Sequence, residues 1–353
     1  MRKYYTRACN LYYGTIAKDL IKKKLALPLC GNKNIAFDSI EILCRDKKAK
    51  LINIKDTKKL NNHLKKKVLK DLKKIVLKRK NLNKYSNISE PLIMGILNMT
   101  PDSFSDGGLY VKSKKAFAHI NDMISKGADI IDIGGESTRP GSNNVPHQIE
   151  WKRLEKIITI FKKKYPKIPL SIDTRKSEVM LRAIKYKSDL INDVSGFNYD
   201  QKAIDKIKSY NVWKVLHHMQ GTPNTMQIKP SYKNVLLDIY DFFESQIKKL
   251  KKMQYSNKII IDPGIGFGKN LKHNLILMNK ISLFHSLGFP ILIGTSRKKF
   301  INQISGVFDT KERIGGTLSS VLFSMSQGVQ IFRVHNVEEV KQGILVYKKL
   351  LDQ

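Results

Sequence analysis

The feature that most constrains this chain is a regular alternation of short apolar runs and longer helical stretches that begins at Pro91. The apolar runs cover residues 92–97, 129–133, 170–173, 190–193, 212–216, 259–262, 291–294 and 330–334. The helical stretches cover residues 113–126, 148–164, 176–187, 200–209, 232–253, 271–287, 311–327 and 336–350. Strands that alternate with helices indicate parallel βαβ units. Eight such units predict a closed (β/α)₈ TIM barrel, with an open doubly wound sheet as the structural alternative.

The first 90 residues precede this pattern and carry a net charge of +18, out of +35 for the whole chain. Short strands are predicted at residues 35–45 and 50–54, and apolar residues at helical spacing predict an amphipathic helix at residues 60–76. We therefore predict a small basic N-terminal α+β accessory domain that ends at residue 88, followed by a catalytic barrel from residue 89 to residue 353.

The positive charge consists mainly of lysine, which supplies 54 of the 65 basic residues. Surfaces that read nucleic acids draw more on arginine because of its bidentate geometry. A solvated lysine surface that attracts anionic substrates is the preferred interpretation, and a nucleic-acid-binding role of residues 1–88 is the alternative. Cys9, Cys30 and Cys44 have no disulfide or zinc spacing. Without a long apolar run, the chain is predicted to be cytoplasmic with no membrane association.

Two glycine-containing loops follow the first two predicted strands, at the strand ends where barrel enzymes place their chemistry. The first loop starts at Asn98, whose side-chain oxygen is a ligand that Mg²⁺ accepts beside water and substrate phosphate. The second loop spans residues 134–142, and its Thr138 and Arg139 offer a hydroxyl and a guanidinium to an anion. An ordinary polar loop is the alternative for the first, and the second alone is a moderate signal for phosphate.

Further polar residues close the later predicted strands. Asp173, Asn192 and Asp262 end the third, fourth and sixth runs. Buried acids are costly unless paired, and a planar heterocycle with N–H donors would pair with them; structural salt bridges are the alternative for any single one. Residues 295–299 follow the seventh run, where barrels often bind phosphate, and residues 333–335 close the eighth.

Taken together, these segments resemble the dihydropteroate synthases from about Pro91 to the C-terminus. The loops at residues 98–108 and 135–142 are similar to the two signature stretches of that family. The remaining matching strings occur in the family's order: Asp173-Thr174-Arg175, Asn192-Asp193-Val194-Ser195-Gly196, His218-Met219-Gln220-Gly221-Thr222-Pro223, Asp262-Pro263-Gly264, Ser296-Arg297-Lys298 and Arg333-Val334-His335. The set in order is far more specific than any one of its members.

The resemblance implies a transferase of folate biosynthesis that joins 6-hydroxymethyl-7,8-dihydropterin diphosphate to p-aminobenzoate, yielding 7,8-dihydropteroate and diphosphate. The implied roles fall into four groups. The pterin would be held by Asp173, Asn192, Asp262 and Lys298, Mg²⁺ by Asn98, the diphosphate by Thr138, Arg139, Arg333 and His335, and p-aminobenzoate by Pro140 and Phe267.

In this family the diphosphate leaves first and the aniline nitrogen then attacks a pterin cation. Asp173 would stabilise that cation, and Asp102 is a candidate acceptor for the aniline proton. The family also tends to form homodimers, which we expect here.

Two positions depart from the family pattern. Lys299 stands where the family usually has serine, at a helix start near the p-aminobenzoate carboxylate, so sensitivity to sulfonamides is in doubt. His217 stands where methionine is common, so stacking on the pterin is expected to differ. A pterin-dependent methyltransferase of the same barrel family is the alternative enzyme, but it has no use for the residues assigned to diphosphate.

Overall fold

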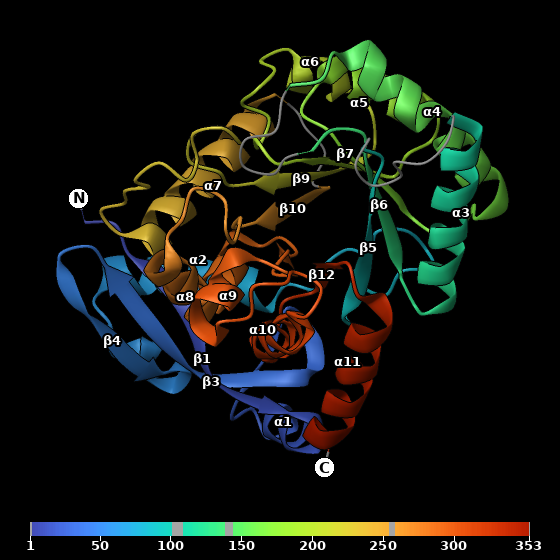
Figure 1. Cartoon of the computed structure of the whole chain (residues 1–353). Helices are drawn as coiled ribbons and strands as arrows, with labels where there is room; N and C mark the ends of the chain where they lie inside the picture. The colour runs from blue at the N-terminus through green and yellow to red at the C-terminus, as the bar shows by residue number, and fades with distance from the viewer. Residues whose placement is uncertain (1, 101–108, 138–143, 254–257, 353) are drawn as a thin grey trace.

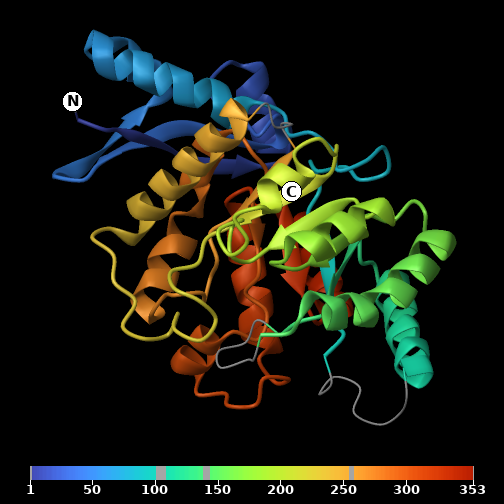
Figure 2. The same cartoon turned by 90° about the horizontal axis from the view of Figure 1, so that it is seen from above.

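The computed structural model describes residues 2–100, 109–137, 144–253 and 258–352. A barrel of parallel strands surrounded by helices forms most of the molecule, and the first quarter of the chain packs against one side and the lower end of it (Figure 1). Figure 2 shows the same arrangement from above, with the helices around the strands. No helix in the described ranges is long and apolar enough to cross a membrane.

The barrel contains eight parallel strands, as the apolar runs predict. They are β5 (Leu92–Asn98), β6 (Ile130–Gly134), β7 (Leu170–Asp173), β8 (Leu190–Asp193), β9 (Trp213–His217), β10 (Ile259–Asp262), β11 (Leu292–Ile293) and β12 (Ile331–Val334). Hydrogen bonds link them in the order β10-β9-β8-β7-β6-β5-β12-β11. A parallel bridge between Ile261 and Ile291 joins the two ends of this order. The sheet therefore closes, which confirms the barrel over the open sheet.

Helices surround the strands in the predicted sequence. They are α3 (Leu109–Ser125), α4 (His147–Lys164), α5 (Ser177–Lys185), α6 (Ala203–Ile207), α7 (Val235–Lys252), α8 (Leu271–Asn279), α9 (Lys299–Ser305), α10 (Ile314–Ser326) and α11 (Val337–Leu351). One prediction is wrong: the single helix expected at 271–287 divides at Lys280 into α8 and the 3₁₀ segment η3 (Ile281–Leu287). All seven η3 residues are buried, and η3 lies beneath the N-terminal sheet. Tertiary packing has overridden the helical pattern there.

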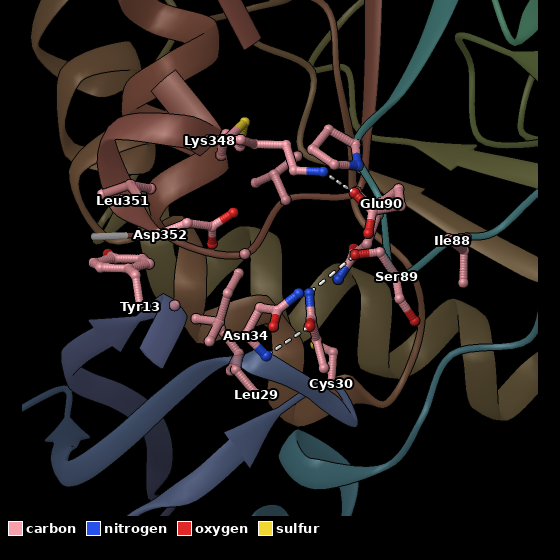
Figure 3. Close-up of a pocket in the computed structure, with 18 residues that line it drawn as sticks. Tyr13, Leu29, Cys30, Asn34, Ile88, Ser89, Glu90, Lys348, Leu351 and Asp352 are labelled. Carbon is pink, nitrogen blue, oxygen red and sulfur yellow. Dashed lines mark hydrogen bonds and ion pairs between the residues drawn. The ribbon is translucent and has the colours of Figure 1, made fainter. Parts of the chain in front are cut away.

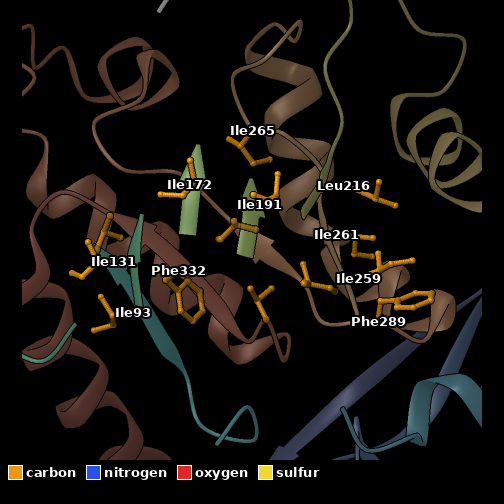
Figure 4. Close-up of a cluster of buried hydrophobic side chains, with 14 of the residues drawn as sticks. Ile93, Ile131, Ile172, Ile191, Leu216, Ile259, Ile261, Ile265, Phe289 and Phe332 are labelled. Carbon is orange, nitrogen blue, oxygen red and sulfur yellow. The ribbon is translucent and has the colours of Figure 1, made fainter. Parts of the chain in front are cut away.

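Successive residues on each barrel strand point in opposite directions. One set, which includes Ile131, Ile172, Ile261 and Phe332, belongs to the large core between strands and helices (Figure 4). The other set forms a separate apolar cluster inside the lower barrel, made of Leu92, Met94, Ile130, Leu190, Trp213, Val215, Ile260, Leu292 and Ile331. Closer to the C-terminal ends of the strands, the inward positions are mostly polar, at Asp132, Asn192, His217, Asp262 and Arg333.

The segment that precedes β5 closes the N-terminal end of the barrel. Leu82 and Ile88 are buried and complete the apolar cluster inside the lower barrel. The indole N–H of Trp213 donates a hydrogen bond of 2.9 Å to the carbonyl of Leu82. Because this segment belongs to the barrel floor as well as to the connection, the division of the chain at residue 88 stays a proposal.

The N-terminal part is an α+β unit, as predicted, with more elements than the sequence indicated. Its elements are β1 (Tyr5–Tyr13), α1 (Gly14–Lys22), β2 (Leu27–Leu29), β3 (Asn32–Cys44), β4 (Lys47–Asn53), η1 (Ile54–Lys59) and α2 (Asn62–Val76). The strands form an antiparallel sheet in which β3 pairs with β1, β2 and β4. The expected strands and helix correspond to β3, β4 and α2, whereas β1, α1 and β2 were not predicted.

Buried and charged contacts fix this unit to the barrel. Tyr5 is fully buried, lies edge-on to Tyr240 of α7 with ring centroids 5.1 Å apart, and donates to Asp241. Glu41 pairs with Arg7 of its own sheet and with Lys280 of the barrel, at 2.6 and 2.7 Å. At the lower edge, the β2–β3 hairpin and the end of α11 enclose a small cavity (Figure 3). The N-terminal unit is therefore packed against the barrel and is not only joined to it through the chain.

Candidate active site

The register of four adjacent strands sets the floor of the site. Asn98 pairs with Gly134, Gly134 with Asp173, and Asp173 with Asn192, so these residues lie at one level at the C-terminal end of the barrel. A Cβ on Gly134 would lie 3.4 Å from the Asp173 Cβ, so glycine leaves room beside that carboxylate. Asp193 follows Asn192 and instead accepts backbone N–H groups of the following turn, at Ser195 and Phe197.

The centre of the barrel holds a carboxylate that the sequence analysis did not select. Asp132, in the middle of β6, is fully buried. It accepts hydrogen bonds from Ser171 at 2.5 Å, from Asn192 at 3.2 Å and from Arg333 at 2.6 Å. These partners come from three other strands, so Asp132 ties the barrel together across its interior. The available signal was an acid inside an apolar run, two residues before the glycine at the strand end.

Asp173 lies two positions closer to the C-terminal end of the barrel than Ser171, the residue paired with Asp132. One of its oxygens accepts from the Arg333 guanidinium at 2.8 Å, while the other, Oδ1, is buried with no hydrogen-bond partner among the described residues. Burial raises the pKa of the Asp173 carboxyl, and the charge of Arg333 opposes that rise. A buried acceptor without a donor costs free energy, so Oδ1 is suited to an N–H group of a ligand.

On the opposite wall, Asp262 faces His217 and Lys298. Its carboxylate accepts from the Gly264 N–H at 2.8 Å and lies 3.9 Å from His217 Nε2. Burial raises the pKa of Asp262 to about 6 and, with the charge of Arg333, lowers the pKa of Lys298 to about 8. The Lys298 ammonium lies 3.9 Å from the centre of the Phe267 ring, in cation–π geometry.

His217 is buried and neutral, because burial lowers its pKa well below the ordinary value. Its Nδ1 lies 2.9 Å from the Val194 carbonyl. A carbonyl only accepts, so the proton is on Nδ1 and Nε2 is left as an acceptor. The ring also meets Phe267 edge-on, with centroids 4.5 Å apart.

The loop between β11 and α9 is fixed by side-chain contacts. Ser296 Oγ lies 3.0 Å from His335 Nδ1, and the Arg297 guanidinium donates to Asn336. These contacts connect the loop to the end of β12. Lys299 is exposed and is the first residue of α9, as the resemblance implied.

A buried ion cluster supports the second glycine loop. Glu136 pairs with Arg175 at 2.8 Å and with Lys176 at 2.9 Å, and Lys176 also pairs with Glu150. Glu136 further accepts from the Val145 N–H at 2.9 Å, so it holds the backbone beyond the loop. The sequence analysis missed this cluster, although Arg175 belongs to one of its matching strings.

Several predicted site residues lie outside the described residues, namely Asp102, Thr138, Arg139 and Pro140. Asn98 is half-buried at the end of β5, and its amide makes no hydrogen bond with another described residue. Within the described ranges, no three His, Cys, Asp or Glu side chains gather into a metal site. Among the described residues at this strand end, Asn98 offers a neutral oxygen of the kind that Mg²⁺ accepts beside water and phosphate.

Comparison with known proteins agrees with this arrangement. Residues 94–335 match the family model described as pterin binding enzyme. The chain is 38% identical to the dihydropteroate synthase of Escherichia coli K12 over 266 residues, covering 75% of this chain and 93% of that protein. The Bacillus subtilis dihydropteroate synthase is 40% identical, with 74% and 89% covered.

Solved structures agree as well. The Yersinia pestis dihydropteroate synthase in complex with a sulfonamide drug superimposes with a TM-score of 0.71 at 36% identity, covering 76% of this chain and 96% of that one. The Xanthomonas albilineans dihydropteroate synthase with 4-aminobenzoic acid gives 0.70 at 34% identity, with 74% and 94% covered. The chain therefore belongs to the dihydropteroate synthases of the pterin-binding enzyme family.

Proposed function

We propose that this chain condenses 6-hydroxymethyl-7,8-dihydropterin diphosphate with p-aminobenzoate at the C-terminal mouth of its barrel. Family membership makes it a transferase. The observation that carries the assignment of the site is Oδ1 of Asp173, which is buried beside Asn192 and has no hydrogen-bond partner in the described part of the chain.

The inward side chains suit the edge of a pterin. Asp173 and Asp262 would accept from ring N–H and amino groups, while Asn192 and Lys298 would donate to ring nitrogen and carbonyl acceptors. The carboxylate of Asp173 would also stabilise the positive charge that develops on the pterin as diphosphate departs. Phe267 and Lys298, at 3.9 Å, would form one wall of the adjoining p-aminobenzoate site.

The leaving group would lie at the rim. Arg333 points into the barrel towards Asp132 and Asp173, so it would have to turn outwards to meet a diphosphate. His335, directly after the end of β12, would complete that grip together with Thr138 and Arg139. Bound Mg²⁺ would neutralise charge on the departing diphosphate, and Asn98 is the described residue suited to hold it.

The attack by the amino group of p-aminobenzoate would require little catalysis by protein side chains. An aniline nitrogen is weakly basic and attacks without a strong general base. Pro140 would line its slot, Lys299 at the start of α9 would attract the carboxylate, and Asp102 is the proposed acceptor of the released proton. Exclusion of water from the cation would matter more than proton transfer.

A diphosphate-release assay with and without p-aminobenzoate tests the proposal. We expect Asp173→Asn and Arg333→Ala to lower kcat/KM by about a thousandfold, because each removes a charge used in the transition state. Near-normal rates in both variants would overturn the site. Transfer of a methyl group without diphosphate release would instead favour the methyltransferase alternative.

We also propose that the chain works as a cytoplasmic homodimer. Adjacent helices α10 and α11 expose the apolar side chains of Phe323, Val346 and Leu350, which would be available to an interface with a second copy. Sedimentation equilibrium of the wild type and of Leu350→Glu tests this, with a dimer expected only for the wild type.

A further inference from the structure

A groove of about 430 Å³ lies at the N-terminal end of the barrel, away from the catalytic mouth. One wall is the connection to β5, with Tyr85 and Glu90, and the opposite wall is α11, with Lys341 and Lys348. The loops that lead into β6 and β7 form the floor. This volume falls within the usual range for small-molecule sites, about 300–1,000 Å³.

Both walls of the groove lie outside the part of the chain that matches the family model. That match starts at residue 94 and ends at residue 335. The connection at residues 85–92 and the α11 residues 341–348 fall on either side of it. Only the floor, at residues 128–129 and 167–168, falls inside the match, at the end of the barrel away from the catalytic mouth.

Two lysines in the groove, Lys167 and Lys341, form no ion pair or hydrogen bond through their ammonium groups with another described residue, whereas Lys348 pairs with Glu90. The other acid, Asp129, accepts a hydrogen bond of 2.8 Å from the Ile93 N–H. Burial raises the pKa of Asp129, and the charge of Lys341 opposes that rise, so this carboxylate offsets part of the positive charge. An anion in the groove would still meet two ammonium groups that make no ion pair.

Most of the remaining lining is apolar, with Ser86 and Asn87 as polar exceptions. The apolar residues are Pro91, Leu92, Ala128, Ile168, Ile344 and Leu345. Tyr85 adds an aromatic ring that is 54% exposed, with the Lys167 ammonium 5.4 Å from its centre. We propose that this groove is a second ligand site, which binds a small organic acid through its carboxylate at Lys167 and Lys341 and through an apolar body on α11 and the strand-leading loops.

The neighbouring cavity is a weaker candidate. It lies between the β2–β3 hairpin and the end of α11 and shares the Glu90–Lys348 pair with the groove (Figure 3). Its volume is about 70 Å³, too small for a molecule of substrate size. The shared ion pair does place the groove against the junction of the two parts of the chain. A ligand in the groove would hold the connection at residues 85–92 against α11.

The test is calorimetric titration of the whole protein with 2-naphthoate at low salt. Wild-type protein is expected to bind it, and the Lys167→Gln, Lys341→Gln double variant to bind about tenfold more weakly, since it lacks both charges that would attract the carboxylate. Lys202→Gln removes an exposed charge beside α6 and should bind as the wild type does. Naphthalene-2-carboxamide and inorganic phosphate should each bind more weakly than 2-naphthoate, because each keeps only one half of the recognised chemistry.

The catalytic mouth could also take up an aromatic acid through Lys299, so the Lys299→Gln variant is titrated in parallel. Binding that survives in Lys299→Gln and is lost in the double lysine variant supports the groove. Binding lost in Lys299→Gln and retained in the double variant overturns it, as does equal binding of the carboxamide. As a second measurement, 2-naphthoate should slow tryptic cleavage at residues 78–84 in the wild type and not in the double variant.

Discussion

The two ends of the barrel interior are built on the same strands, yet they differ completely in chemistry. At the lower end, Ile130, Leu190 and Ile260 form a dry apolar layer. Two residues further along the same three strands stand Asp132, Asn192 and Asp262. Because alternate residues of a strand share a face, a shift of two positions along each strand leads from the apolar core to the polar site. The lower layer stabilises the fold, which allows the upper layer to keep costly buried charges.

The largest effect should follow from opening the lower layer. Trp213→Ala removes a buried indole and leaves the Leu82 carbonyl without its 2.9 Å hydrogen bond. The free energy of unfolding should fall by about 4 kcal/mol, measured by chemical denaturation. Activity per folded molecule should stay within about twofold at 20 °C, because no site residue is touched. Trp213→Phe is the control, with a smaller loss; a parallel collapse of kcat would show that the two ends are not separable.

Asp132→Asn tests the upper layer at its hub. The amide keeps the shape of the side chain but removes the negative charge of the carboxylate, which accepts from Arg333 at 2.6 Å and from Ser171. We expect kcat/KM for the pterin diphosphate to fall about a hundredfold while the unfolding free energy changes far less than in Trp213→Ala. Ser171→Ala is the control, because it removes one hydrogen-bond partner of Asp132 and leaves the charge of Asp132 in place. An equal loss in Ser171→Ala would mean that the charge of Asp132 is not the cause.

Acidity should affect the two ends differently, since the titratable groups lie at the upper one. Burial raises the pKa of Asp173 to about 7 and that of Asp262 to about 6, so both carboxyls become protonated as the pH falls and can no longer accept from the pterin. The pKa of Lys298 is lowered to about 8, so above that pH its charge is lost. A plot of kcat/KM against pH should therefore be bell-shaped, falling about tenfold per unit below pH 7 and more steeply below pH 6. In Asp262→Asn the added steepness below pH 6 should disappear; a profile that keeps it would assign it to another group.

The sequence predicted the upper layer better than the connections between elements. Asp173 and Asp262 end their strands at the predicted residues because an acid closing a short apolar run is a local signal. The split at Lys280 and the strand β1 depend on contacts between distant segments, such as Tyr5 with Tyr240, which no local window contains. Asp132 was missed for the same reason: its role appears only when Ser171, Asn192 and Arg333 are brought around it.

The smallest effect is expected at His217. This polar residue belongs to the upper layer, but it is neutral and packed against an aromatic ring, as the apolar residues of the lower layer are packed against one another. It is neutral, its Nδ1 proton is used by the Val194 carbonyl, and its ring packs edge-on against Phe267. Methionine would fill the same space and place a sulfur against that ring. His217→Met should therefore change kcat/KM by about threefold or less, with the acid limb of the pH profile unchanged. A loss of tenfold or more would mean that Nε2, 3.9 Å from Asp262, accepts a hydrogen bond from the pterin. In that case the upper layer of this chain would recognise its substrate with one more polar group than methionine provides.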